Sequence, residues 1–492
     1  MSHNQLLLLF VVLYLLGTLG IGVWAGTRIK NTTDFAAAGH TLPLIMVVTT
    51  TFATWFGAET VMGIPARFVQ NGLSAVVEDP FGASMCLVLV GAFFARRLYK
   101  MSLLTIGDFY RHRFGKEVEI FCSIAIIISY LGWVAAQITA LGLVFSVLSD
   151  GGITRQTGML IGTASVLVYV LIGGMMAVAW TDFIQMTVLV VGLSVIAVMA
   201  GHQVGGASHV IAQGHDRHWF QFVGSGATLK DYVGLFAAGI TMMLGSIPQQ
   251  DVFQRVMSAK DSRSASLGAM IGGFSYLFFA FVPMFLVASA LLIMPHQAAA
   301  FLDSDPQKIL PTLVLSKMPF IAQIFFFGAL LSAIKSTSSA TLLAPSTSFV
   351  ENVLKHIHAG MKDKQQLRAL RITIFVFTGL VLWFAIKMEG TPIYDMVGDA
   401  YKVTLVGAFV PLTFGLYWKR ATTQGALLSI VLGIAVWGSF VLNDYGYLGS
   451  GKWGDLCPGQ LAGLLAALFG MLAGSLSPQW IADRRTHLAH QA

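Results

Sequence analysis

Thirteen long apolar stretches follow one another along this chain of 492 residues, and they constrain its fold more than any other feature. A helix of about 20 apolar residues can cross the hydrocarbon core of a bilayer. Only 11% of the residues are charged, against about 25% in soluble domains. We therefore predict an all-α membrane protein with about 13 transmembrane helices, at roughly residues 5–26, 42–70, 72–98, 118–149, 156–176, 180–201, 233–256, 264–294, 319–354, 369–388, 395–418, 424–442 and 459–477.

Lysine and arginine residues are spread unevenly over the connections between these stretches. With the N-terminus outside, 20 of them fall on the inner side and 8 on the outer side. The positive-inside rule then predicts an integral inner (cytoplasmic) membrane protein with its N-terminus outside and its C-terminus in the cytoplasm. This topology accounts for the net charge of +7, so we expect a lipid bilayer around the chain and no nucleic-acid partner.

The motifs of several other protein classes are missing from the sequence. There is no GxxxxGK[ST] loop to bind ATP phosphates, and the three cysteines have no metal-binding spacing. The twelve histidines fall in connections or at the ends of stretches. We expect a protein that is not an enzyme, with no organic cofactor and no obligate protein partner.

Two of the stretches are interrupted by residues that break helices. Thr49–Thr60 contains β-branched residues, a glycine and a carboxylate, and Met243–Asp251 contains glycine, proline and polar residues. Interrupted helices at matching positions of two halves indicate a transporter binding site, because unwound backbone in a membrane must face a cavity or a ligand. Stretches 2–6 and 7–11 then form two repeats. Two kinks that serve only packing are the alternative.

A run of hydroxyl residues occupies the ninth stretch. Ala333, Ser336 and Thr337 stand at i, i+3 and i+4, which places them on one helix face. Two hydroxyls and a small residue against an unwound helix would suit a sodium ion. Close packing of small residues against another helix is the alternative for any one of them.

Several motifs together resemble the sodium/solute symporter family, including its sodium/proline-type and choline-type members, along nearly the whole chain. They are Ala53–Gly57, Gly173–Gln185, Gln254-Arg255 and Ala333–Thr341. The resemblance implies a leucine-transporter-like core of two inverted five-helix repeats. The expected organisation is a leading helix and loop (1–41), a first repeat (42–232), a second repeat (233–420), and two trailing helices with a short cytoplasmic tail (421–492).

The resemblance also implies residues that bind sodium, the only metal we expect. These are the backbone carbonyls of Ala53, Phe56 and Ala333 and the hydroxyls of Ser336 and Thr337. It further implies an ion pathway or second ion site at Asp182 and Ser339.

A departure from the family stands beside this site. Lys335 occupies a position at which relatives carry an apolar residue, and a lysine at mid-membrane depth needs a partner or water. We expect its ammonium to reach Asp182. Snorkelling toward the cytoplasm is the alternative.

Matching positions also indicate a pocket for the solute. They point to Trp55, Trp133, Gln249, Gln250 and Asp251, and Glu59 adds a carboxylate nearby. Aromatic faces and carboxylates together suit an ammonium group. Either tryptophan could instead serve packing or an interfacial belt.

The sequence thus predicts a sodium-coupled symporter that imports a small polar solute, an amino acid or another amine-bearing compound, by alternating access. Two alternatives stay open: a transporter-like solute sensor, and a sodium-independent or proton-coupled carrier that uses Lys335.

Overall fold

The computed structural model describes most of the chain: residues 3–27, 31–358, 360–449, 453–455 and 457–483. Within these ranges the secondary structure is helical, with no β-strand beyond an isolated bridge between Leu42 and Ala259. Some basic residues that entered the topology count lie outside the described ranges, namely Arg28, Lys30, Lys452, Arg484 and Arg485.

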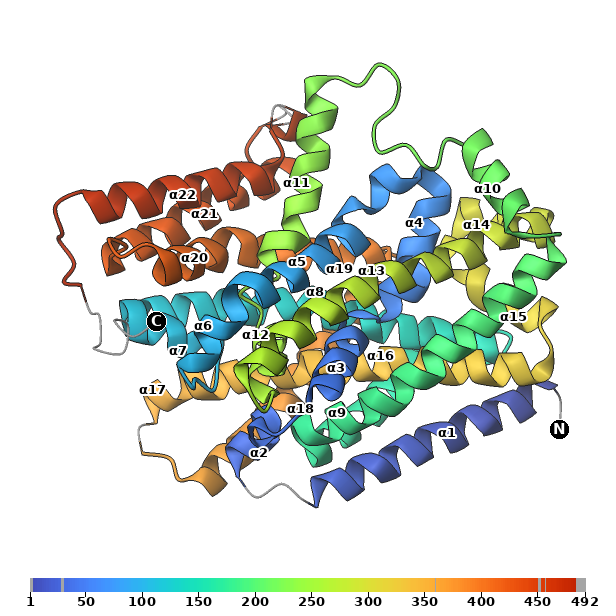
Figure 1. The fold of residues 1–492 in the computed structure, drawn as a ribbon, viewed down its shortest axis with the longest axis horizontal. Coiled ribbons are helices and arrows are strands. Elements are labelled where there is room, and N and C mark those ends of the chain that lie inside the picture. Colours follow the sequence, from blue (N-terminus) through green and yellow to red (C-terminus); the bar gives the residue numbers. More distant parts are fainter. Residues whose placement is uncertain (1–2, 28–30, 359, 450–452, 456, 484–492) are drawn as a thin grey trace.

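The helices pack into one bundle (Figure 1). In chain order they are α1 (His3–Gly26), α2 (Thr32–Ala37), α3 (Leu44–Trp55), α4 (Ile64–Asn71), α5 (Ala83–Leu89), α6 (Ala95–Lys100), α7 (Ile106–Phe114), α8 (Lys116–Leu148), α9 (Arg155–Gln203), α10 (Ala207–Asp216), α11 (Leu229–Gly245), α12 (Gln250–Ser258), α13 (Ser262–Ile293), α14 (Pro295–Ser304), α15 (Ile309–Lys317), α16 (Phe320–Phe349), α17 (Lys355–Ile357), α18 (Asp363–Lys387), α19 (Ile393–Thr404), α20 (Val410–Tyr417), α21 (Thr423–Asp444) and α22 (Gly459–Leu476).

Many of these helices are long and apolar enough to cross a membrane. Ten meet that description among the described residues, and up to twelve do so if each of two bent pairs counts as one span. Because only helices and closed barrels can satisfy their backbone groups in hydrocarbon, the prediction of an all-α membrane protein is confirmed.

One of the ten, α9, crosses twice. Its 49 residues would extend over roughly 74 Å if straight, but Gly174 has non-helical dihedral angles within it. The hydroxyls of Tyr169 and Thr181, twelve residues apart, share a hydrogen bond. A straight helix would separate them by about 18 Å, so the chain doubles back at Gly174. Dividing α9 there accounts for thirteen spans.

The two interrupted stretches are both broken helices, as the sequence predicts. The first consists of α3 and the segment Glu59–Asn71, which meet at 57°. The second consists of α11 and α12, which meet at 47°. A π-helical turn, Glu59–Gly63, opens the second half of the first broken helix. Both breaks lie in the interior, because Trp55, Ser246 and Gln250 are at most 2% exposed.

Two long helices form the centre of the bundle. The most apolar window of α16 is 78% buried and that of α8 is 61% buried, against 22% for α1. In Figure 1, α1 runs along one edge of the molecule, and α21 and α22 lie together on the opposite side. Side chains of α8 are hydrogen-bonded to both broken helices, Gln137 to Ala58 and Tyr130 to Asp251.

The reversal at Gly174 yields a prediction about stability. Its φ is +51°, and a Cβ atom there would come within 2.7 Å of the carbonyl oxygen of Phe35. We expect Gly174→Ala to destabilise the protein by at least about 1–2 kcal/mol, seen as a lower melting temperature in detergent. The control is Gly379→Ala in α18, where nothing lies within 4 Å. Equal melting temperatures for the two variants would contradict the reversal.

Candidate functional site

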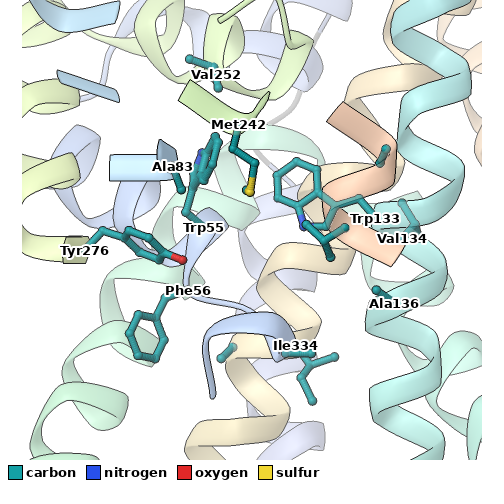
Figure 2. Close-up of a cluster of buried hydrophobic side chains, with 14 of the residues drawn as sticks. Trp55, Phe56, Ala83, Trp133, Val134, Ala136, Met242, Val252, Tyr276 and Ile334 are labelled. Atoms are coloured by element: carbon teal, nitrogen blue, oxygen red, sulfur yellow. The ribbon is translucent and has the colours of Figure 1, made fainter. Parts of the chain in front are cut away.

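Three aromatic rings from three helices surround the first break. Trp55 ends α3, Trp133 lies in α8 and Tyr401 lies in α19. The Trp55 ring centroid is 5.8 Å from that of Trp133 and 5.9 Å from that of Tyr401, and the latter two are 5.4 Å apart. Figure 2 shows Trp55 and Trp133 converging from separate helices. We call these three residues the aromatic cage.

Two carboxylates are hydrogen-bonded to residues of this region. Glu59 accepts a hydrogen bond from Trp133 Nε1 at 3.3 Å, and Asp251, at the start of α12, accepts one from the Tyr130 hydroxyl at 2.5 Å. The Tyr130 ring stacks on Trp133 at 6.0 Å. The cage therefore connects the two broken helices through α8.

A third carboxylate lies behind the cage. Tyr276 donates a hydrogen bond to Asp79 at 2.6 Å, and its hydroxyl lies 2.9 Å from that of Thr60. Thr60 in turn donates to the carbonyl oxygen of Trp55 at 3.0 Å. This chain of contacts gives a polar partner to a carbonyl at the end of α3.

Within the described part of the chain these carboxylates form no ion pair, although the buried Arg255, whose Nη1 donates to the backbone carbonyl of Asp251 at 3.0 Å, is a nearby positive charge for Asp251. Glu59, Asp79 and Asp251 are each at most 2% exposed, and none has a described lysine or arginine nitrogen within 4 Å. Tyr401 OH and Asp251 Oδ2 also have no described hydrogen-bond partner. Buried carboxylates require pairing, so the region is suited to a cationic ligand.

The hydroxyls of α16 gather near the first break, as predicted. Thr337 Oγ1 lies 3.4 Å from the carbonyl oxygen of Ala53. Ser336 donates a hydrogen bond to Asp182, which also accepts one from Thr50 at 2.6 Å. Ala333 lies one helical turn before Thr337, and Phe56 has non-helical dihedral angles after α3. Oxygen atoms of α3, α9 and α16 thus meet within one buried region.

Some predicted site residues point elsewhere. Gln250 accepts a hydrogen bond from the backbone N–H of Ile106 at 2.8 Å, which directs its amide toward α7 rather than the tryptophans. Ser339 donates to the carbonyl oxygen of Ser336 at 2.9 Å, within its own helix. Gln249 donates to Ser129 at 2.8 Å. The hydrogen bonds thus direct Gln250 away from the tryptophans and Ser339 away from Asp182, whereas Gln249 contacts α8 one helical turn from Trp133.

The predicted contact between Lys335 and Asp182 is wrong. The Lys335 ammonium donates to Thr18 Oγ1 on α1 at 3.0 Å and lies 4.6 Å from the Tyr169 ring centroid. No ion pair joins it to Asp182. The side chain leaves α16 on the side of α1, because a hydroxyl and an aromatic face stabilise a buried ammonium there.

A cavity lies about two helical turns along α8 and α19 from the cage residues Trp133 and Tyr401. It has a volume of about 530 Å³, and its lining includes Arg67, Thr139 and Tyr394. Arg67 forms an ion pair with Asp395 at 3.4 Å. The hydroxyl of Tyr394 accepts a hydrogen bond from the backbone N–H of Asp79 at 3.4 Å, so Tyr394 separates the cavity from the buried carboxylates.

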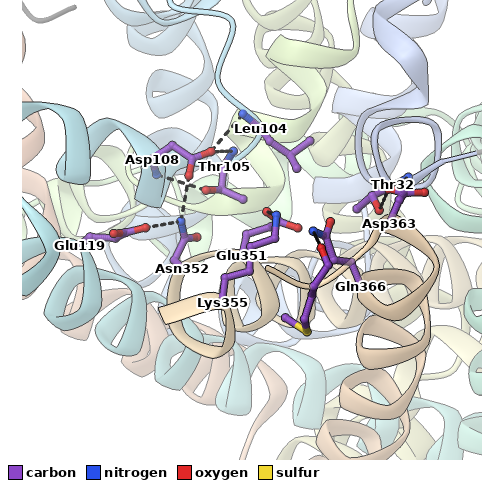
Figure 3. Close-up of polar contacts among 11 residues, drawn as sticks. Thr32, Leu104, Thr105, Asp108, Glu119, Glu351, Asn352, Lys355, Asp363 and Gln366 are labelled. Atoms are coloured by element: carbon purple, nitrogen blue, oxygen red, sulfur yellow. Dashed lines mark hydrogen bonds and ion pairs between the residues drawn. The ribbon is translucent and has the colours of Figure 1, made fainter. Parts of the chain in front are cut away.

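A polar network surrounds Glu119 near the other end of α8 (Figure 3). Asn352 donates to Asp108 at 3.2 Å and to Glu119 at 2.9 Å, and His356 Nε2 lies 2.7 Å from Glu119. Glu119 and the cavity-lining Leu143 are separated by roughly 36 Å along α8. Along α8, Trp133 therefore lies between the cavity near one end of the helix and the polar network near the other end.

Sequence reasoning missed four residues of the site: Tyr130, Gln137, Tyr276 and Tyr401. Tyr130 and Gln137 stand at i−3 and i+4 from Trp133, so helical spacing around that tryptophan could have found them. Tyr276 and Tyr401 lie on helices whose neighbours in space are distant in sequence, so no local signal indicates them.

The position of Lys335 yields a prediction about pairwise coupling. The Lys335 ammonium contacts Thr18. The effects of Lys335→Met and Thr18→Val on the free energy of unfolding should therefore differ from additivity by about 0.5 kcal/mol or more in the double mutant. Lys335→Met and Asp182→Asn should add to within about 0.5 kcal/mol. Double-mutant cycles measured by thermal unfolding in detergent decide this, and coupling to Asp182 but not to Thr18 would contradict it.

Comparison with known proteins identifies the family to which the chain belongs. Residues 35–433 match the family described as the sodium:solute symporter family. The chain is 26% identical to the human high affinity choline transporter 1 over 447 residues, which covers 88% of this chain and 76% of that protein. It is 27% identical to the high-affinity proline transporter PutP of Bacillus subtilis over 485 residues, covering 94% and 97%.

Solved structures show the same fold. A Na⁺-coupled sialic acid symporter in an outward-open state superposes with a TM-score of 0.79 at 20% identity, covering 96% of this chain and 97% of the other. A nucleobase-cation-symport-1 family transporter, MHP1, gives a TM-score of 0.55 at 12% identity, covering 94% and 100%. The predicted leucine-transporter-like core is confirmed, and the chain belongs to the sodium:solute symporter family.

Proposed function

We propose that this protein is a sodium-coupled symporter that imports a small solute with a positively charged nitrogen, an amino acid or another amine. The observation that carries the proposal is the aromatic cage of Trp55, Trp133 and Tyr401, with Glu59 hydrogen-bonded to one of its rings. Aromatic faces attract a desolvated cation, and the carboxylate supplies the opposite charge.

The sodium site that we propose uses the carbonyls of Ala53, Phe56 and Ala333 and the hydroxyls of Ser336 and Thr337. The short separation between Thr337 Oγ1 and the Ala53 carbonyl supports this assignment. Oxygen ligands suit a hard cation. Ser336 donates to Asp182, so we propose that Asp182 receives the ion on its way to or from this site.

We further propose that the solute enters from outside through the cavity beside Tyr394. The end of α8 that carries Glu119 follows the basic residues Arg111, Arg113 and Lys116, which places it in the cytoplasm by the positive-inside rule. Opening the polar network there while closing the cavity would expose the cage to the cytoplasm. In this scheme residues 42–232 and 233–420 are the two repeats that move against each other.

Sodium dependence provides the first test of this function. Thr337→Ala and Ser336→Ala each remove one oxygen, so each should raise the sodium concentration for half-maximal uptake by about tenfold, equivalent to about 1.4 kcal/mol. Uptake is measured in proteoliposomes with a sodium gradient. Ser338→Ala is the control, because that hydroxyl donates to the carbonyl of Ile334 within its own helix. Equal wild-type uptake with sodium or potassium would contradict sodium coupling.

The solute class provides the second test. A cation over an indole gains about 2 kcal/mol, roughly 30-fold in affinity, so affinity for an amine should fall in the order Trp, Phe, Leu at position 55. Binding of choline, proline and other amines is measured by competition at saturating sodium. Trp383→Leu is the control, because that tryptophan is 60% exposed on α18. Uptake of neutral sugars that no amine inhibits would refute the assignment.

A further inference from the structure

The amide of Gln137 is hydrogen-bonded to two consecutive residues at the first helix break. Its Oε1 accepts a hydrogen bond from the backbone N–H of Ala58 at 3.0 Å, and its Nε2 donates to Glu59 Oε2 at 2.5 Å. Ala58 lies between the end of α3 and the π-helical turn, and its N–H finds this partner on another helix. The Gln137 side chain is fully buried. One side chain therefore holds both the backbone at the break and Glu59, the carboxylate that we propose pairs with the solute.

Gly57 brings the proposed ion and solute sites into direct proximity. A Cβ atom at this position would lie 2.8 Å from Thr337 Oγ1, 2.8 Å from Glu59 Oε2 and 2.9 Å from Gln137 Oε1. The hydroxyl of Thr337, the carboxylate of Glu59 and the amide of Gln137 thus lie around the Cα atom of Gly57, and no side chain separates them. Any other residue would force at least one of these oxygen atoms away.

We propose that Gln137 is a positioning residue that couples sodium binding to solute binding, an inference that rests on the function proposed above. Sodium bound by the carbonyls of Ala53 and Phe56 would fix the geometry of the break. The N–H of Ala58 is then held in place, Gln137 is oriented by it, and Glu59 faces the cage. Without the ion, the backbone is free to shift and Glu59 loses one of its two fixed donors.

This coupling has a direct measure. Binding energies are reciprocal, so a solute that binds better with sodium also lowers the sodium concentration needed for half-saturation, by a factor of about 5 to 150 in coupled systems. The experiment titrates sodium at constant ionic strength, with and without choline or L-proline as the probe, and follows thermal stabilisation of the purified full chain. The ratio of the two half-saturation values is the coupling factor.

In Gln137→Leu, which keeps the volume but removes both hydrogen bonds, we expect the coupling factor to fall to about 2 or less. Sodium-induced stabilisation without a probe shows that this variant is folded. Gln137→Glu keeps an acceptor for Ala58, and because two buried carboxyls this close share one proton it also keeps a hydrogen bond to Glu59, so it should bind sodium within about threefold of the wild type and retain more coupling than Gln137→Leu. Ser123→Ala is the matched control on the same helix, because that buried hydroxyl has no described partner and does not line the cavity.

The outcomes separate this inference from the proposed function. A wild-type coupling factor of one with both probes contradicts the proposed function, and this inference falls with it. A wild-type factor above five that persists in Gln137→Leu and in Gln137→Glu overturns the role of Gln137 alone. Loss of coupling in Ser123→Ala as well would show a general effect of altering α8 and would also overturn it.

Discussion

The need to satisfy backbone polar groups within a membrane governs this structure. Two helices are broken in the interior, and each break frees amides and carbonyls that hydrocarbon cannot solvate. Neighbouring side chains provide the partners. At the first break Gln137 accepts from the N–H of Ala58, and at the second the Thr404 hydroxyl donates to the carbonyl of Gly245 at 2.6 Å. Both partners come from helices that pack on the breaks, so the position of each functional group depends on that packing.

The carboxylates of this site form no ion pair within the described residues. Glu59, Asp79 and Asp251 are buried and hydrogen-bonded, but no described lysine or arginine pairs with them. Hydrogen bonds from tyrosine, tryptophan and glutamine stabilise a carboxylate without neutralising it. A protein arranged in this way retains an attraction for small cations at its centre. Under the proposed function, a bound ion and solute would supply positive charge to these carboxylates, and their binding would then be coupled to the conformation of the broken helices.

Much of this architecture could be predicted from the sequence, and the exceptions have physical reasons. Apolar length identifies the spans, and β-branched, glycine and polar residues at mid-span identify both breaks. Helical spacing from Trp133 reaches Tyr130 and Gln137. Periodicity carries no information about which helix lies opposite, so the contribution of Tyr401 to the cage was not predictable. For the same reason Lys335 was expected beside Asp182, although its ammonium contacts Thr18.

The contacts of α16 with α1 change how the first helix should be regarded. Ser332 donates to the Tyr14 hydroxyl at 2.6 Å, and Lys335 donates to Thr18. These are polar attachments one turn apart on each helix, at the boundary between the central bundle and lipid. A version of this protein without α1 would expose an ammonium and a hydroxyl of α16 to hydrocarbon. The first helix therefore supplies hydrogen-bond partners to polar side chains of α16 that would otherwise face lipid. A shortened form without α1 would need an apolar residue at position 335.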